Sequence, residues 1–165
     1  LLALGRGPED AADPRTWPEL FLDQVRRTPD APAVVSGAQT LTYRELADRA
    51  CALARLLAEA GVGAEQRVGI VLPRSVELVV ALHAVALAGG AFVPVDPAHP
   101  AERIAQTLTD AAPVLVLTTS GTALPETGTR RLDVDALDLT GDGLVRPVRA
   151  EQAAYVIYTS GSTGR

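Results

Sequence analysis

Residues 67–95 of this 165-residue chain read RVGIVLPRSVELVVALHAVALAGGAFVPV, and this stretch decides the fold. Two short apolar runs, 67–72 and 91–95, flank a segment at 76–88 that is apolar on almost every side. Short apolar runs bounded by Pro or Gly are typical of buried strands, and a helix that is apolar all round belongs in a core. At this length it falls short of the about 20 residues that span a bilayer. The stretch predicts a strand, a core helix and a second strand parallel to the first.

The same alternation extends in both directions along the chain. Thr16 with Glu19 and Thr42 with Glu45 match the capping-box pattern that starts helices, and Gly61 suits the left-handed position that ends one. These elements predict an α/β fold with a mainly parallel sheet flanked by helices. The expected helices cover 17–27, 42–60 and 101–110; the expected strands cover 33–41 as a hairpin, 114–118, 131–134 and 154–158, the last as an interior strand; residues 137–149 are expected to be mostly loop.

The composition is that of an ordinary globular domain. Apolar residues make up 47% and charged residues 21% of the chain, which argues against disorder, and its length allows a real core. The net charge is −5 and no run of like charge occurs, so no nucleic-acid footprint and no polybasic membrane patch is predicted. The single cysteine, Cys51, allows no internal disulfide, which fits a reducing cytoplasm.

The strand at 154–158 leads into a loop rich in hydroxyl groups. Its two glycines have no side chain to hold a ligand away, and they allow backbone angles that turn successive N–H groups towards an anion. The Ser and Thr hydroxyls can donate hydrogen bonds to phosphate oxygens, so the loop is predicted to hold the outer phosphates of ATP. Ser, Thr and Gly also mix in exposed linkers, and composition alone leaves a linker as the alternative. The loop residues are Thr159, Ser160, Gly161, Ser162, Thr163 and Gly164.

Other phosphate and metal motifs do not fit the sequence. The Walker loop needs four residues between its glycines and a following Lys, whereas two residues separate Gly161 and Gly164 and the chain contains no Lys. Residues 118–122, TTSGT, repeat the theme after a strand but lack the second glycine, so an ordinary loop is expected there. His83 on an apolar helix and His99 beside prolines are expected to serve packing and a turn. No metal site is predicted, because neither has a Cys or His partner at ligand spacing.

Four segments carry a resemblance to a known family. Residues 155–165, YVIYTSGSTGR, resemble the phosphate-binding signature of adenylate-forming enzymes, most closely that of the amino-acid adenylation domains of nonribosomal peptide synthetases. Residues 41–46, LTYREL, resemble the first core motif of these domains, and residues 87–96, LAGGAFVPVD, resemble the second. Residues 21–35, FLDQVRRTPDAPAVV, are similar to their usual opening. The resemblance covers almost the whole chain in the family order, and it favours a phosphate loop over a linker.

The resemblance implies both the architecture and the activity. The chain is expected to be the N-terminal part of the large subdomain of an adenylation domain, truncated. In this family the carboxylate of an amino acid attacks the α-phosphate of Mg²⁺-bound ATP, and pyrophosphate leaves. The aminoacyl adenylate then passes to the phosphopantetheine thiol of a carrier domain. By residue-wise transfer, the β- and γ-phosphates are held by Thr159, Ser160, Gly161, Ser162, Thr163 and Gly164.

The remaining expectations concern what surrounds the chain. Residues 1–15, rich in Gly, Pro, Ala and Asp, are expected to be an interdomain linker after a condensation domain, and 16–165 an adenylation domain incomplete at its C-terminus. The catalytic lysine, the Mg²⁺ ligands and the amino-acid pocket are expected beyond Arg165, so the chain alone is expected to be inactive. The parent is expected to be a cytoplasmic synthetase of a peptide secondary metabolite. The alternatives are another adenylate-forming ligase, for a fatty or aryl acid, and a non-catalytic remnant or docking module.

Overall fold

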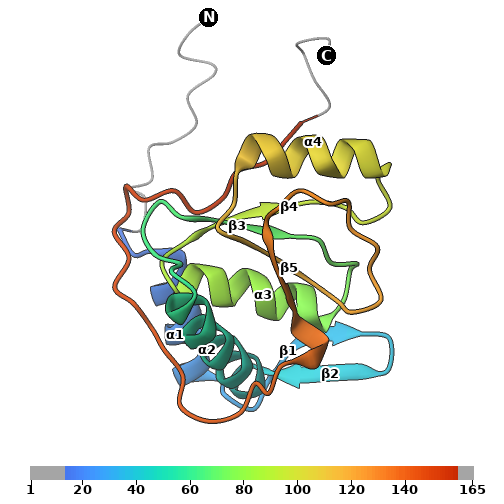
Figure 1. The fold of residues 1–165 in the computed structure, drawn as a ribbon. Helices are drawn as coiled ribbons and strands as arrows, with labels where there is room; N and C mark the ends of the chain where they lie inside the picture. Colours follow the sequence, from blue (N-terminus) through green and yellow to red (C-terminus); the bar gives the residue numbers. More distant parts are fainter. Residues whose placement is uncertain (1–13, 160–165) are drawn as a thin grey trace, which may run out of the picture.

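The structure, a computed structural model, describes residues 14–159 and confirms the predicted α/β class. An antiparallel hairpin precedes a four-stranded, all-parallel sheet with the strand order β4-β3-β5-β6 (Figure 1). The helices are α1 (Trp17–Arg27), α2 (Tyr43–Glu59), α3 (Val76–Leu87) and α4 (Ala101–Ala111), and a 3₁₀ turn covers Val134–Ala136. The strands are β1 (Pro32–Ser36), β2 (Gln39–Thr42), β3 (Arg67–Ile70), β4 (Ala91–Pro94), β5 (Leu115–Thr118) and β6 (Arg130–Asp133).

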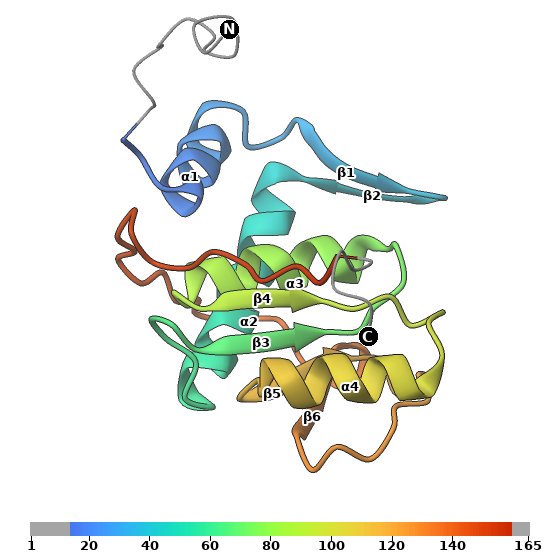
Figure 2. The ribbon, with the colours of Figure 1, turned by 90° about the horizontal axis from the view of Figure 1, so that it is seen from above.

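Helices cover both faces of the parallel sheet (Figure 2). The crossover from β3 to β4 places α3 on one face, and the crossover from β4 to β5 places α4 on the other. Successive side chains of a strand point to opposite faces, and β5 shows the result. Leu115 and Leu117 are buried in the core on the α2–α3 side, whereas Val116 is buried against α4. A strand with apolar residues on both faces therefore lies in the middle of the sheet.

The larger core lies where α2 packs on α3. Leu53 and Leu57 of α2 are fully buried, and Val80 and Val85 of α3 are at most 3% exposed. Helix α3 is enclosed between the sheet on one side and α1 and α2 on the other. This position explains why the helix is apolar on almost every side, as the sequence pattern predicted.

The predicted helix ends are confirmed. The Glu45 carboxylate accepts a hydrogen bond from the Thr42 backbone N–H at 2.8 Å, and the Glu45 N–H donates to the Thr42 hydroxyl at 3.2 Å. Hydrogen bonding to its charged form lowers the pKa of the Glu45 carboxyl. The Glu19 carboxylate accepts in the same way from the Thr16 N–H at 2.7 Å. Gly61 ends α2 with φ of +94°, a left-handed angle that glycine adopts without steric cost.

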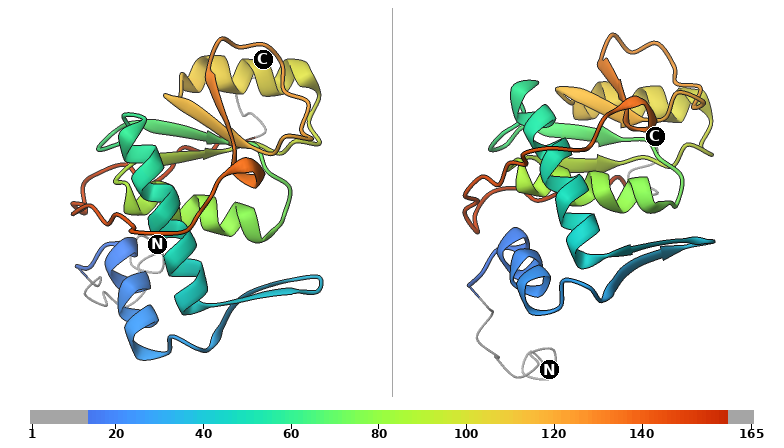
Figure 3. Two further views of the ribbon diagram at one scale, coloured as in Figure 1. Left: turned by 60° about the horizontal axis from the view of Figure 1, so that its bottom comes forward. Right: turned by 90° about the horizontal axis from the view of Figure 1, so that it is seen from below.

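Residues 137–152, the return segment, carry the chain from β6 at one edge of the sheet, across α2, to the opposite edge beside β4 (Figure 3). The Leu144 N–H donates to the Cys51 carbonyl at 2.9 Å. Arg146 donates from its backbone N–H to the Leu87 carbonyl at 2.9 Å and from Nη1 to the Val62 carbonyl at 3.0 Å. The predicted loop thus has no helix or strand, yet hydrogen bonds tie it to α2, to Val62 and to the end of α3.

The prediction of an interior strand at 154–158 is wrong for the described residues. The segment lies at the edge of the sheet beside β4, where only Tyr155 forms a bridge, with Phe92. The side chains of Tyr155 and Ile157 are 57% and 58% exposed. The β-branched and aromatic run correctly indicated extended backbone. Such a run does not specify which strands lie beside it, because β-propensity reflects only how well the side chains fit a pleated surface.

Candidate functional site

The segment that leads to the predicted phosphate loop runs parallel to β4. The Phe92 N–H donates to the Ala154 carbonyl at 3.1 Å, and the Val156 N–H donates to the Phe92 carbonyl at 2.9 Å. The rings of Phe92 and Tyr155 stack with their centroids 5.6 Å apart. The chain therefore continues past Tyr155 in the direction of the carboxyl ends of the strands. In open parallel sheets, ligands bind outside the carboxyl ends of the strands.

Two side-chain contacts flank residues 154–158, the edge segment. At its start, Glu65 Oε1 accepts a hydrogen bond from the Ala153 N–H at 3.1 Å. At its end, the Tyr158 hydroxyl donates to the Asp110 carboxylate on α4. Burial and the neighbouring Asp110 carboxylate raise the pKa of Tyr158 to about 12. The phenol is therefore protonated at neutral pH and can act as the hydrogen-bond donor.

The structure describes one of the six predicted loop residues. Thr159 directly follows Tyr158 and is exposed. Ser160, Gly161, Ser162, Thr163 and Gly164 lie outside the described residues. The described part of the site is the extended segment that delivers the chain to the loop, together with its contacts to β4, Glu65 and Asp110.

The similar sequence at 118–122 has a different environment. The Asp135 carboxylate accepts hydrogen bonds from the Ser120 N–H at 2.9 Å and from the Ser120 hydroxyl at 2.6 Å. These hydrogen bonds lower the pKa of Asp135. Arg131 Nη2 donates to the Thr119 carbonyl at 2.6 Å, and the Thr119 and Thr122 hydroxyls lie 2.8 Å apart. The Thr118 hydroxyl is buried and has no hydrogen-bond partner among the described residues. The polar groups of residues 119–122 bind one another, β6 and the 3₁₀ turn, as expected for an ordinary structural loop.

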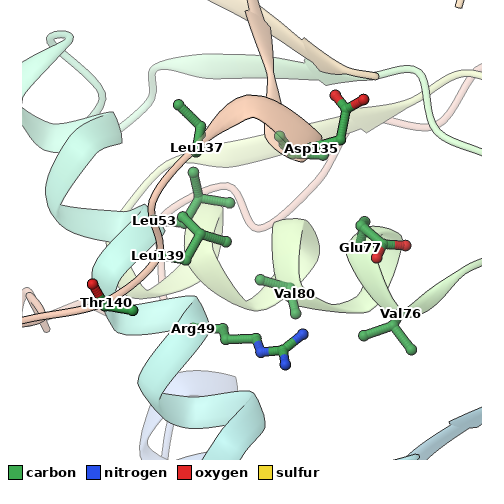
Figure 4. A pocket seen from close by; sticks show the side chains of 10 residues that line it. Arg49, Leu53, Val76, Glu77, Val80, Asp135, Leu137, Leu139 and Thr140 are labelled. Atoms are coloured by element: carbon green, nitrogen blue, oxygen red, sulfur yellow. The ribbon is translucent and has the colours of Figure 1, made fainter. Parts of the chain in front are cut away.

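A pocket of about 320 Å³ lies between α2, α3 and the start of the return segment (Figure 4). Apolar side chains such as Leu53, Val80 and Leu139 line it together with the charged Arg49 and Glu77. Sequence analysis did not anticipate this pocket, because its lining comes from three segments that are far apart in the chain. Thr159 is not among its lining residues, and the pocket is separate from the edge segment.

Within the part of the chain that the structure describes, the two histidines and the cysteine are not arranged as metal ligands. His83 Nδ1 lies 2.9 Å from the Val79 carbonyl, and its ring packs on Trp17 and Phe21 at centroid distances of 4.9 and 4.3 Å. Burial raises the pKa of the Cys51 thiol, which makes it a poor nucleophile. Within residues 14–159, no three His, Cys, Asp or Glu side chains gather closely enough to hold a metal ion. Nor does any helix in that range have the length and apolar character needed to cross a bilayer.

The His83 environment predicts a pH dependence of stability. Burial lowers the pKa of His83 in the folded chain below its usual value of 6.5. The stability contributed by His83 is therefore complete above about pH 6.5 and is lost as the pH falls towards the folded-state pKa, because the unfolded chain gains the proton first. Urea unfolding at about pH 7.5 and about pH 5.5 should show a smaller loss of stability for His83→Phe than for the wild type. Equal losses in both proteins would contradict this assignment.

Comparisons with known proteins agree with this geometry. The family described as AMP-binding enzyme matches residues 21–165. Bacitracin synthase 1 of Bacillus licheniformis is 43% identical over 158 residues, which cover 91% of this chain and 3% of that protein. The nonribosomal peptide synthetase FmoA3, in its AMPPNP-bound form, superposes with a TM-score of 0.81 at 36% identity, covering 93% of this chain and 17% of that one. The N-terminal subdomain of Klebsiella oxytoca NpsA, in complex with 3-hydroxyanthranilyl-AMSN, superposes with a TM-score of 0.84 at 28% identity, covering 95% and 41%.

These three matched proteins are longer than this chain. The chain spans 3% of bacitracin synthase 1, 17% of the FmoA3 chain and 41% of the NpsA subdomain chain.

Proposed function

The chain belongs to the AMP-binding enzyme family, and on that basis we propose that residues 16–165 are the N-terminal portion of an amino-acid adenylation domain of a nonribosomal peptide synthetase. The parent domain activates an amino acid with ATP as aminoacyl-AMP and releases pyrophosphate. The observation that carries the proposal is the 43% identity to bacitracin synthase 1 across 91% of the chain. Residues 1–15 are the linker to an upstream condensation domain in this proposal.

The phosphate loop is the part of the reaction that this chain contributes. Its hydroxyls and backbone N–H groups hold the β- and γ-phosphates of ATP, which places the α-phosphate for attack by the amino-acid carboxylate. The support is the edge segment, which runs parallel to β4 and directs the chain to the carboxyl ends of the strands, where ligands bind in open parallel sheets. The residues assigned to this role are Thr159, Ser160, Gly161, Ser162, Thr163 and Gly164.

The other components of the reaction are assigned outside the described residues. Mg²⁺ supplies charge neutralisation at the phosphates when bound, but residues 14–159 offer no cluster of ligands for it. As the resemblance to adenylation domains implies, we place its ligands, the catalytic lysine and the amino-acid pocket in the part of the synthetase beyond Arg165. The carrier domain with its phosphopantetheine arm and the condensation domain are the partners, in a cytoplasmic enzyme.

A ligase for aryl acids is the second candidate, because the NpsA subdomain binds 3-hydroxyanthranilyl-AMSN. The identity to NpsA is 28%, compared with 36% to FmoA3 and 43% to bacitracin synthase 1. This difference favours the peptide synthetase over the aryl-acid ligase.

ATP–pyrophosphate exchange tests the proposal. The synthetase polypeptide that contains residues 1–165 should catalyse exchange with one or a few members of an amino-acid panel and not with aryl or fatty acids. The 165-residue chain by itself should show no exchange with any acid. Exchange with an aryl acid and with no amino acid would favour the aryl-acid ligase instead. Robust exchange by the isolated 165-residue chain would contradict the placement of the other components beyond Arg165.

A further inference from the structure

Among residues 14–159, one side-chain hydrogen bond holds the end of the edge segment. Val156 makes the last backbone hydrogen bond to β4, and within the described range the backbones of Ile157, Tyr158 and Thr159 make none. The Ile157 side chain is 58% exposed and gives little packing. The hydroxyl of Tyr158, bound to Asp110, is therefore the polar contact that ties the chain to the body of the protein directly before the phosphate loop.

Asp110 occupies a position that a helix by itself disfavours. It lies in the last turn of α4, which ends at Ala111, where the negative end of the helix dipole repels a carboxylate. Within the described residues, Asp110 forms no ion pair with an arginine; its hydrogen bond comes from Tyr158. The contact with Tyr158 thus gives a reason for an acidic residue where the helix would be more stable with a basic one.

The chemistry of the pair suits a constant anchor. Burial and Asp110 raise the pKa of Tyr158 to about 12, although the positive charge of Arg67 acts in the opposite direction. The phenol keeps its proton over the whole physiological range, so the hydrogen bond does not switch with pH. A hydrogen bond to a carboxylate is also stronger than one between neutral groups.

We propose that Tyr158 and Asp110 are positioning residues that hold the start of the phosphate loop against α4 and so set the place of Thr159 for the phosphates of ATP. This inference rests on the proposed function of the loop. Neither residue is among those assigned to the phosphates. Their effect reaches ATP through the backbone from Tyr158 to Thr159, because an error of a fraction of an ångström at a positioning loop weakens the contacts that depend on it.

Four single variants of the synthetase polypeptide test the proposal by ATP–pyrophosphate exchange. Tyr158→Phe and Asp110→Ala each remove the hydrogen bond, and each should raise KM for ATP on the order of fivefold to tenfold while leaving KM for the amino acid unchanged. Asp110→Asn keeps an acceptor oxygen and should restore most of the ATP affinity. Tyr155→Phe is the matched control, since it removes the same atom from the same segment and the Tyr155 hydroxyl has no hydrogen bond among residues 14–159.

The outcomes separate this inference from the proposed function. The wild type could show normal exchange while Tyr158→Phe and Asp110→Ala have the same KM for ATP as Tyr155→Phe. That result would overturn the inference and leave the proposed function intact. Equal rises in both KM values would also overturn it, because they would indicate general loss of structure. If the wild type shows no exchange, ATP binding measured by calorimetry decides. Weaker binding by Tyr158→Phe and by Asp110→Ala, with Tyr155→Phe unchanged, supports the positioning role, and equal binding by all variants refutes it.

Discussion

Replacement of Thr159 and Ser160 together by alanine is expected to lower kcat/KM for ATP on the order of 100-fold in the synthetase polypeptide. Thr159 directly follows the edge segment, and these two residues are the first of the predicted phosphate loop in the sequence. In the proposed function, their hydroxyls donate to charged phosphate oxygens whose negative charge must be balanced as pyrophosphate leaves. A preorganised donor of this kind contributes more than a donor in water. The measurement is ATP–pyrophosphate exchange with saturating amino acid and varied ATP.

The loop at 118–122 provides the matched control. Thr119→Ala with Ser120→Ala changes the same residue types in another Thr-Ser-Gly sequence that also follows a strand. These hydroxyls bind Thr122 and Asp135, so the control should lower the melting temperature but leave KM for ATP unchanged. A loss of ATP affinity equal to that of the Thr159 and Ser160 double variant would remove the phosphate loop assignment.

Gly90→Ala is expected to lower the free energy of unfolding by about 1–3 kcal/mol. A Cβ at this position would lie 2.7 Å from Val62 Cγ1, 3.1 Å from the Gln66 carbonyl oxygen and 3.3 Å from Val85 Cγ1. Val62 and Val85 are fully buried, so neither methyl group has free space to move into. Urea unfolding of the 165-residue chain measures the effect.

Two further variants establish the cause. Gly121→Ala is the control, because a Cβ at Gly121 would meet nothing within 4 Å, and its effect should stay within about 0.5 kcal/mol. Val62→Ala removes the methyl group closest to the new Cβ. Combined with Gly90→Ala, it should cost less than the sum of the two single changes, by about 1 kcal/mol. Simple additivity would show that the new methyl group does not destabilise the chain through Val62.

The elements of the fold were predictable because each has a local cause. The capping boxes at Thr16 and Thr42 start α1 and α2, and the fully apolar segment at 76–88 becomes the core helix α3. The apolar runs on either side of α3 become β3 and β4, as the strand–helix–strand pattern required. Hydrogen bonds within one turn and the burial of an apolar face depend on neighbours in sequence, so periodicity reports them directly.

The phosphate loop was also visible in the sequence, because its chemistry lies in consecutive residues from Thr159 to Gly164. A Gly-rich hydroxyl loop after a strand needs no long-range partner to be identified. The assignment of its role remains a prediction, since five of these residues lie outside the described range.

Only the tertiary structure decided how distant segments meet. Nothing local to Tyr158 indicates that its hydroxyl binds Asp110, and the position of 154–158 at the edge of the sheet contradicts the strand's buried composition. The return segment is held by Cys51, Val62 and Leu87 carbonyls, which no composition or period would reveal. The sequence by itself determined the succession of strands and helices along the chain and the loop that follows them. The order of the strands within the sheet, the choice of the edge strand and the anchoring contacts depend on pairing between residues far apart in the chain. That pairing is settled only when the whole core packs.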